Sequence, residues 1–146
     1  MHALPRDRFA PDRLWAWGGD AYVPVGRAAA PDEWDELLYA DPDAAAVTQV
    51  RRATSSLSCR AVVVDMLDSL LLEPGHRVLE LSTGTGWNAA LAAARAGAGD
   101  GDGDGRITSV EVDPRSPGPP AIGSRGTPPG FGSRPATGTW ARPTTG

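Results

Sequence analysis

Residues 77–114, RVLELSTGTGWNAALAAARAGAGDGDGDGRITSVEVDP, decide the fold that the sequence predicts. The short apolar run RVLEL at 77–81 indicates a strand, and the glycine-rich turn STGTG follows it directly. The alanine-rich run at 87–98 predicts a helix, and the alternating β-branched residues of RITSVEV predict a second strand. This order predicts a βαβ unit with parallel strands and a right-handed crossover, so the expected fold class is α/β.

The turn between the first strand and the helix is the candidate ligand site, because small molecules bind such units at the carboxyl ends of the strands. Gly84 and Gly86 let the backbone approach a ligand where a Cβ would intrude. Glu111 ends the second strand, where a carboxylate can accept hydrogen bonds from both hydroxyls of a ribose. The dinucleotide pattern G-x-G-x-x-G is met only in its tolerant form, GTGWNA. The alternative interpretation is a tight turn with a solvated Glu111.

The segments around this unit give weaker signals. Residues 1–31 contain four prolines and are expected to be loop-like, whereas APDEWDELLYA at 30–40 predicts a short helix. Residues 59–77 predict a longer helix that ends at a Glu-Pro-Gly break. Its expected buried face consists of Val62, Val63, Met66, Leu67, Leu70 and Leu71. Residues 114–146 are rich in Pro and Gly and are expected to be disordered, because they cannot bury enough apolar surface to offset their ordering entropy.

Composition excludes several classes of function. A net charge of −4 gives no basic face for nucleic acid. Cys59 is the only cysteine, so no intrachain disulfide can form and a reducing cytosol is the default setting. The N-terminus lacks the apolar run of a signal peptide, and no stretch is long enough to span a membrane. We expect a soluble cytoplasmic protein without a nucleic-acid or membrane partner, and with two histidines we expect no histidine-based metal or triad site.

The run LEPGHRVLELSTGTGWNAALAAA, followed by ITSVEVDP, resembles the S-adenosyl-L-methionine-binding core of class I methyltransferases. More narrowly, it is similar to the protein-L-isoaspartate O-methyltransferases. The upstream segments LPRDRFAPDRLW and TSSLSCRAVVVDMLDSL are also similar to that family, so the resemblance covers about residues 4–114. It implies a Rossmann-like class I methyltransferase fold, S-adenosyl-L-methionine as cofactor, and an isoaspartyl- or aspartyl-containing protein or peptide as substrate.

The resemblance also assigns roles to residues of this chain. Glu111 is expected to hold the ribose, and the serine at 82 stands where the family has glycine, so its Cβ and hydroxyl are expected to crowd the cofactor. Ser58 is expected at the active site beside the substrate carboxylate, with Thr54 and Ser55 near it; a simple N-cap on the following helix is the alternative for Ser58. The residues expected to bind the cofactor are Glu80, Ser82, Thr83, Gly84, Gly86 and Glu111. Because an ionised carboxylate is already a nucleophile, the protein mainly has to align it with the activated methyl group, and no general base is expected.

The chain then divides into a substrate-side segment at 1–59, a cofactor-binding βαβ core at 60–113 and a Pro/Gly-rich tail at 114–146. The family needs further strands after VEVDP, which the tail is not expected to supply. We therefore expect an incomplete fold that contains only the N-terminal part of the sheet, and a copy that is weakly active or inactive. Back-translated with GC-rich codons and read in another frame, the tail can encode a helix, a strand and a GDG turn of the family type. A frameshift after residue 114 is our hypothesis for this departure.

A calcium-binding loop is the main alternative. Residues 100–111, DGDGDGRITSVE, match the pattern D-x-[DN]-x-[DN]-G-x5-E at every specified position, with Asp100, Asp102, Asp104 and Glu111 as ligands. Such a loop needs a helix on each side, and Pro114 prevents one of normal length after it. A calcium-binding protein and an inactive fragment therefore remain the alternatives to a methyltransferase.

Overall fold

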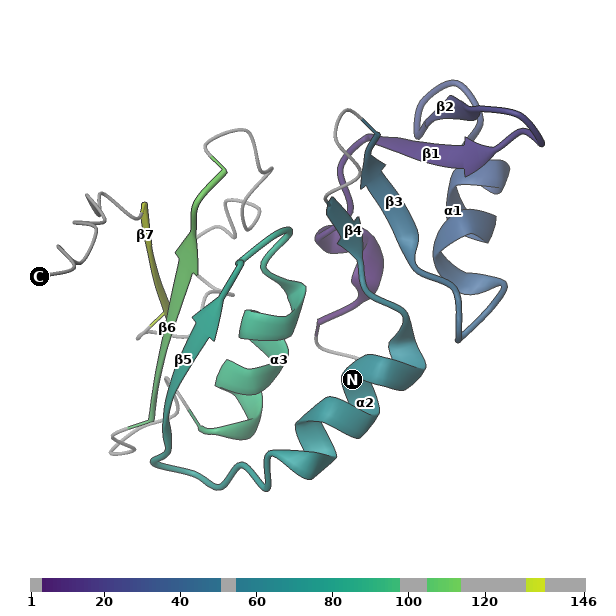
Figure 1. Ribbon diagram of the computed structural model, residues 1–146. Coiled ribbons are helices and arrows are strands. Elements are labelled where there is room, and N and C mark those ends of the chain that lie inside the picture. The colour runs from purple at the N-terminus through teal and green to yellow at the C-terminus, as the bar shows by residue number, and fades with distance from the viewer. Residues whose placement is uncertain (1–3, 51–54, 98–104, 114–130, 136–146) are drawn as a thin grey trace, which may run out of the picture.

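The computed structural model describes residues 4–50, 55–97, 105–113 and 131–135 of the chain. Two β-sheets lie side by side, and the helices α2 and α3 run between and below them (Figure 1). The expected mixed α/β class is confirmed. The elements in chain order are η1 (Arg6–Arg8), β1 (Arg13–Trp17), β2 (Tyr22–Gly26), α1 (Pro31–Tyr39), β3 (Ala46–Gln49), β4 (Ser55–Leu57), α2 (Arg60–Ser69), β5 (Arg77–Leu81), α3 (Trp87–Arg95), β6 (Arg106–Glu111) and β7 (Phe131–Pro135).

The first sheet is antiparallel and has the strand order β2-β1-β3-β4. Strands β1 and β2 pair over their whole length, from Arg13 opposite Gly26 to Trp17 opposite Tyr22. The expectation that residues 1–31 are loop-like is therefore wrong. Pro24 lies within β2, which is an edge strand, and an edge strand tolerates a missing N–H that an inner strand would not.

The predicted helix at residues 30–40 is confirmed as α1, which packs against β1 and β2 of this sheet. Pro31 stands in its first turn, where the missing N–H is unimportant. Trp34 and Leu38, one turn apart, are fully buried in the same apolar cluster as Leu14 of β1. The Trp34 indole N–H also donates to the Pro11 carbonyl oxygen at 3.2 Å, which fixes the helix against the chain before β1.

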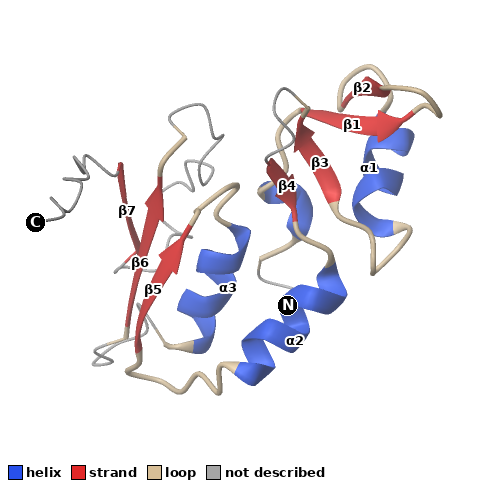
Figure 2. Ribbon diagram, in the orientation of Figure 1, coloured by secondary structure: helices blue, strands red, loops and turns tan. Residues whose placement is uncertain are grey.

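The second sheet is parallel and confirms the predicted βαβ unit. Strand β5 pairs with β6 from Arg77 opposite Arg106 to Leu81 opposite Val110, and α3 connects them. Helix α3 begins at Trp87 and is buried along most of its length, because its small alanine side chains let neighbouring elements approach closely. Figure 2 shows α3 alongside β5, on the side of the parallel sheet that faces the antiparallel sheet.

A third parallel strand, β7, pairs with β6 and comes from the segment that was expected to be disordered. That expectation is wrong for residues 131–135; the other residues of 114–146 lie outside the described part of the chain. Apolar burial alone does not decide whether such a segment is ordered, because an edge strand can be held by backbone hydrogen bonds to one neighbour. Pro135 ends this edge strand, where its missing N–H is tolerated. An incomplete Rossmann-like fold stays a prediction.

Helix α2 forms where expected but buries a narrower face. Only Val63 and Leu67, one turn apart, are buried among the residues expected to face the core. The exposed members of the predicted face are Val62, Met66, Leu70 and Leu71. The sequence pattern marks which side of a helix is apolar, but the width of contact depends on how many elements pack against it, and α2 lies at the border of the fold (Figure 2).

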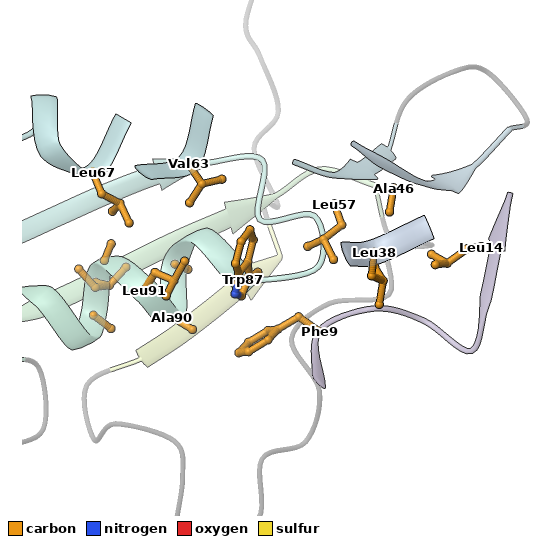
Figure 3. Close-up of a cluster of buried hydrophobic side chains, with 14 of the residues drawn as sticks. Phe9, Leu14, Leu38, Ala46, Leu57, Val63, Leu67, Trp87, Ala90 and Leu91 are labelled. Carbon is orange, nitrogen blue, oxygen red and sulfur yellow. The ribbon is translucent and has the colours of Figure 1, made fainter. Parts of the chain in front are cut away.

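One apolar cluster extends through both halves of the chain. Figure 3 shows Trp87 of α3 close to Phe9, Leu57 and Val63, which come from the first two thirds of the sequence. The division at residues 59 and 60 stays a prediction, since the side chains on both sides of it share this cluster. Within the described residues, no helix combines the length and apolarity needed to cross a membrane.

Candidate functional site

The turn at residues 82–86 joins β5 to α3 and bends over the end of β6. The backbone N–H groups of Ser82 and Thr83 both donate to the Val110 carbonyl oxygen, at 2.8 and 3.3 Å. Gly84 and Gly86 have φ angles of 55° and 81°, which lie in the left-handed region that glycine adopts without strain. A Cβ built on Gly84 would meet no heavy atom within 4 Å among its surroundings, so the backbone of the turn borders open space there.

Ser82 also has a positive φ, of 70°. A residue with a Cβ is strained in this conformation by about 1 kcal/mol, which is the physical reason that glycine suits this position. The serine side chain is exposed. The departure from the family pattern therefore carries a backbone strain in addition to the steric effect expected from the sequence.

Glu111 is joined to the glycine turn by its side chain. One carboxylate oxygen, Oε2, accepts a hydrogen bond from the Gly84 N–H at 2.8 Å. The other, Oε1, accepts from the N–H groups of Val112 and Asp113, at 2.7 and 2.8 Å. The interpretation of Glu111 as a merely solvated side chain is therefore wrong, and this carboxylate lies at the turn where the sequence predicted a ligand site.

Glu80 lies at the end of β5, directly opposite Ser109 of β6. Ser109 is fully buried; its hydroxyl donates to Oε2 of Glu80 and lies 2.6 Å from the hydroxyl oxygen of the buried Thr83. Burial raises the pKa of Glu80 above its ordinary value, the hydrogen bond from Ser109 opposes this shift, and the charge of Glu111 adds to it. The two acids thus border the same turn in a partly desolvated setting.

On the substrate side, Ser58 lies in the junction between β4 and α2 and is half-buried. The N-cap of α2 is Cys59, and no side chain caps this helix. The interpretation of Ser58 as an N-cap is therefore wrong. Ser55 is half-buried in β4, and Thr54 lies outside the described residues.

Arg6 connects this junction to the glycine turn, and sequence reasoning missed it. Its buried guanidinium donates to the carbonyl oxygens of Leu57 and Ser58, at 2.9 and 2.7 Å, and to that of Leu38. The same group lies 5.6 Å from the ring centre of Trp87, the first residue of α3 after the turn. Arg6 therefore links the backbone of the predicted substrate segment to the first residue of the helix that follows the glycine turn.

Sequence reasoning also missed Ser109. The sequence contains one indication of its role. Ser109 is a small polar residue that alternates with Ile107 and Glu111 along the predicted strand, so its side chain is on the same, buried face. Arg6 stood inside a segment used for the family resemblance, but no local pattern shows that a charged residue is buried.

The calcium alternative needs four acidic ligands, of which one lies in the described part of the chain. Asp100, Asp102 and Asp104 lie outside the described residues, whereas Glu111 ends a strand and binds the backbone of the turn. In the described part of the chain, no group of three or more His, Cys, Asp or Glu side chains is arranged to hold a metal ion.

The fold is that of an α/β protein with a glycine turn at the carboxyl ends of parallel strands, which is where open α/β sheets bind small molecules. The family model of the protein-L-isoaspartate(D-aspartate) O-methyltransferases (PCMT) matches residues 1–115, and the chain belongs to this family. The resemblance found in the sequence is thereby confirmed. No curated protein matches the chain.

Proposed function

We propose that this chain binds S-adenosyl-L-methionine and methylates the carboxylate of isoaspartyl or aspartyl residues in proteins or peptides. One observation carries the proposal for this member of the family. Glu80 and Glu111, from the ends of adjacent parallel strands, both border a glycine turn whose backbone faces open space at Gly84.

The side chains at the turn fit the charges of this cofactor. Glu80 and Glu111 are acidic, and the cofactor carries an ammonium and a sulfonium group. Glu111 is the residue for the ribose, whose hydroxyls would share the carboxylate with its backbone donors. Gly84 and Gly86 permit the close approach of the backbone that the methionine end requires.

The cofactor supplies an electrophilic methyl group, so the protein mainly has to position the substrate carboxylate in line with it. Ser58 is the residue that we assign to this carboxylate, with Ser55 and Thr54 as neighbouring contributors. Support comes from Arg6, which fixes the backbone of Ser58 and packs over Trp87 at the start of α3. This arrangement holds the substrate segment in register with the glycine turn without any general base.

Two features predict weak activity. Ser82 strains the turn, and the third strand of the parallel sheet is a Pro/Gly-rich edge strand. The frameshift hypothesis and a cytoplasmic location also stay predictions. Sequencing the gene tests the first of these: absence of an open alternative frame after residue 114 would rule it out.

Calorimetric titration with S-adenosylhomocysteine tests the cofactor site. We expect binding by the unmodified chain, loss of binding in Glu111→Ala, and unchanged binding in Asp65→Ala, which removes an exposed acid from α2 as a matched control. Transfer of labelled methyl groups to an isoaspartyl peptide tests the substrate. The control is the same peptide containing methylated aspartate, which lacks the free carboxylate. Calcium binding that is lost in Asp102→Ala, without nucleoside binding, would instead support the calcium alternative. Binding of neither ligand would support an inactive fragment.

A further inference from the structure

Ser109 is a buried hydroxyl for which the proposed reaction gives no direct role. It is wholly inaccessible to solvent and lies between Ile107 and Glu111 on the face of β6 that α3 covers. Burial of a hydroxyl in such a place is unfavourable unless it is hydrogen-bonded. Ser109 satisfies this requirement with two side chains of the cofactor site, Glu80 and Thr83.

The hydroxyl hydrogens of Ser109 and Thr83 have one arrangement when Glu80 is ionised. A carboxylate only accepts hydrogen bonds, so the single hydrogen of Ser109 points to Glu80. The Thr83 hydroxyl must then be the donor in its 2.6 Å contact with Ser109. Protonation of Glu80 turns the carboxyl group into a donor and removes this fixed order. These two hydrogen bonds therefore link the charge of Glu80 to the orientation of the Thr83 hydroxyl.

Thr83 in turn belongs to the backbone of the glycine turn. Its N–H donates to Val110 of β6, and its carbonyl oxygen accepts from the N–H of Gly86, the N-cap of α3, at 2.8 Å. We infer that Ser109 is a positioning residue of the cofactor site: its hydroxyl holds the Glu80 carboxylate ionised and in one orientation, and couples it through Thr83 to the glycine turn. This inference rests on the proposed function, because it gives Glu80 a cofactor to bind.

Among the side chains that the structure describes, those that act on the Glu80 carboxyl are Ser109 and Glu111, and neither is a cation. Strand β6 contributes the like charge of Glu111, and the turn contributes only hydroxyl and backbone groups. The only charged residue of α3 is Arg95 in its last turn, which pairs with Asp68 at 2.8 Å. Removal of the Ser109 hydroxyl therefore leaves burial and Glu111 to raise the pKa of Glu80 further.

The test is a pH series of S-adenosylhomocysteine binding by calorimetry. Affinity of the unmodified chain should fall at acid pH as Glu80 is protonated, and this dependence should be absent in Glu80→Gln. In Ser109→Ala we expect about tenfold weaker binding at neutral pH and a pH midpoint that moves upward. Thr108→Ala deletes the hydroxyl of the preceding residue, whose side chain lies on the other face of β6, and should leave the midpoint unchanged. An unmoved midpoint in Ser109→Ala would overturn the inference while leaving the proposed function intact.

A second pair of variants covers a folding defect in Ser109→Ala. Thr83→Ser keeps the hydroxyl and should keep the midpoint, whereas Thr83→Val keeps the shape and should move the midpoint upward, because Ser109 then lacks its donor. The Glu80 carboxyl can also be titrated without any cofactor by carbon NMR of glutamate-labelled protein, with Glu80→Gln identifying the signal. If the unmodified chain does not bind the nucleoside, the proposed function fails, and the NMR titration alone decides the inference. A Glu80 signal with the same midpoint in Ser109→Ala contradicts it in either case.

Discussion

Replacement of Arg6 by methionine tests how the two halves of the site are held together. Methionine has a similar length and is apolar, so it fills the buried position without the guanidinium. The carbonyl oxygens of Leu57, Ser58 and Leu38 then lose their donor. The junction that carries Ser58 also loses its polar link to α3, because the cation over Trp87 is removed, while the apolar contacts of Leu57 and Val63 remain.

The expected magnitude follows from these contacts. A hydrogen bond to a charged group contributes about 1.5–3 kcal/mol, so three of them contribute about 4.5–9 kcal/mol. Burial of the guanidinium opposes this gain and also lowers the pKa of Arg6. We therefore expect Arg6→Met to reduce the free energy of unfolding by about 3 kcal/mol, a large part of the roughly 5–15 kcal/mol of a typical domain.

Urea denaturation followed by tryptophan fluorescence measures this loss, and Trp87 lies next to the altered side chain. Arg8→Met is the matched control, because Arg8 is exposed in the same short helix and should change stability by less than about 0.5 kcal/mol. Arg6→Lys keeps the charge but not the planar set of donors, and should lose an intermediate amount. Equal stability of Arg6→Met and Arg8→Met would refute the reasoning.

Three further predictions follow from backbone strain and from burial of an acid. Ser82→Gly should raise the free energy of unfolding by about 1 kcal/mol and tighten S-adenosylhomocysteine binding, because the φ of 70° no longer strains a side chain; a loss of stability in urea would contradict this. Leu71→Gly should also stabilise the folded protein by about 1 kcal/mol, since Leu71 is exposed and has a φ of 46°. Leu70 has a helical backbone conformation, so Leu70→Gly should destabilise the protein by about as much; thermal denaturation measures both changes. Because burial raises the pKa of Glu80 in the folded state, the folded chain binds this proton more tightly than the unfolded chain, and stability is lost as pH rises from the ordinary glutamate pKa through the raised one. Glu80→Gln should remove that decrease in urea titrations carried from the ordinary glutamate pKa upward, and an unchanged pH profile would contradict the assignment.

Elements with a strong local signal were predicted well. The helices at Pro31, Arg60 and Trp87 begin close to where proline, periodicity or the glycine turn predicted them. Strands β5 and β6 were also found, and their parallel pairing followed from the helix between them. In each of these elements the information lies within about 20 consecutive residues, which is the range over which periodicity and capping act.

Elements that depend on a distant partner were missed. The β1–β2 hairpin and the strand β7 contain prolines that argue against strands, and only their edge positions make these prolines tolerable. The apolar side of α2 was identified, but the number of its residues that are buried depends on what packs against it. Whether a strand lies at the edge of a sheet, and how many residues of a helix are buried, depend on the assembled fold and cannot be read from one segment.

The candidate site divides in the same way. The sequence by itself indicated the glycine turn, Glu111 at the end of the next predicted strand and, through the family resemblance, Glu80 directly before the turn, because each of these follows from the order of elements along the chain. Only the tertiary structure decided that Arg6 holds a carbonyl oxygen 52 residues away and that Ser109 holds Glu80 from the neighbouring strand. Both are polar groups whose burial is favourable only with partners from elsewhere in the chain, and those partners meet them only when the chain folds.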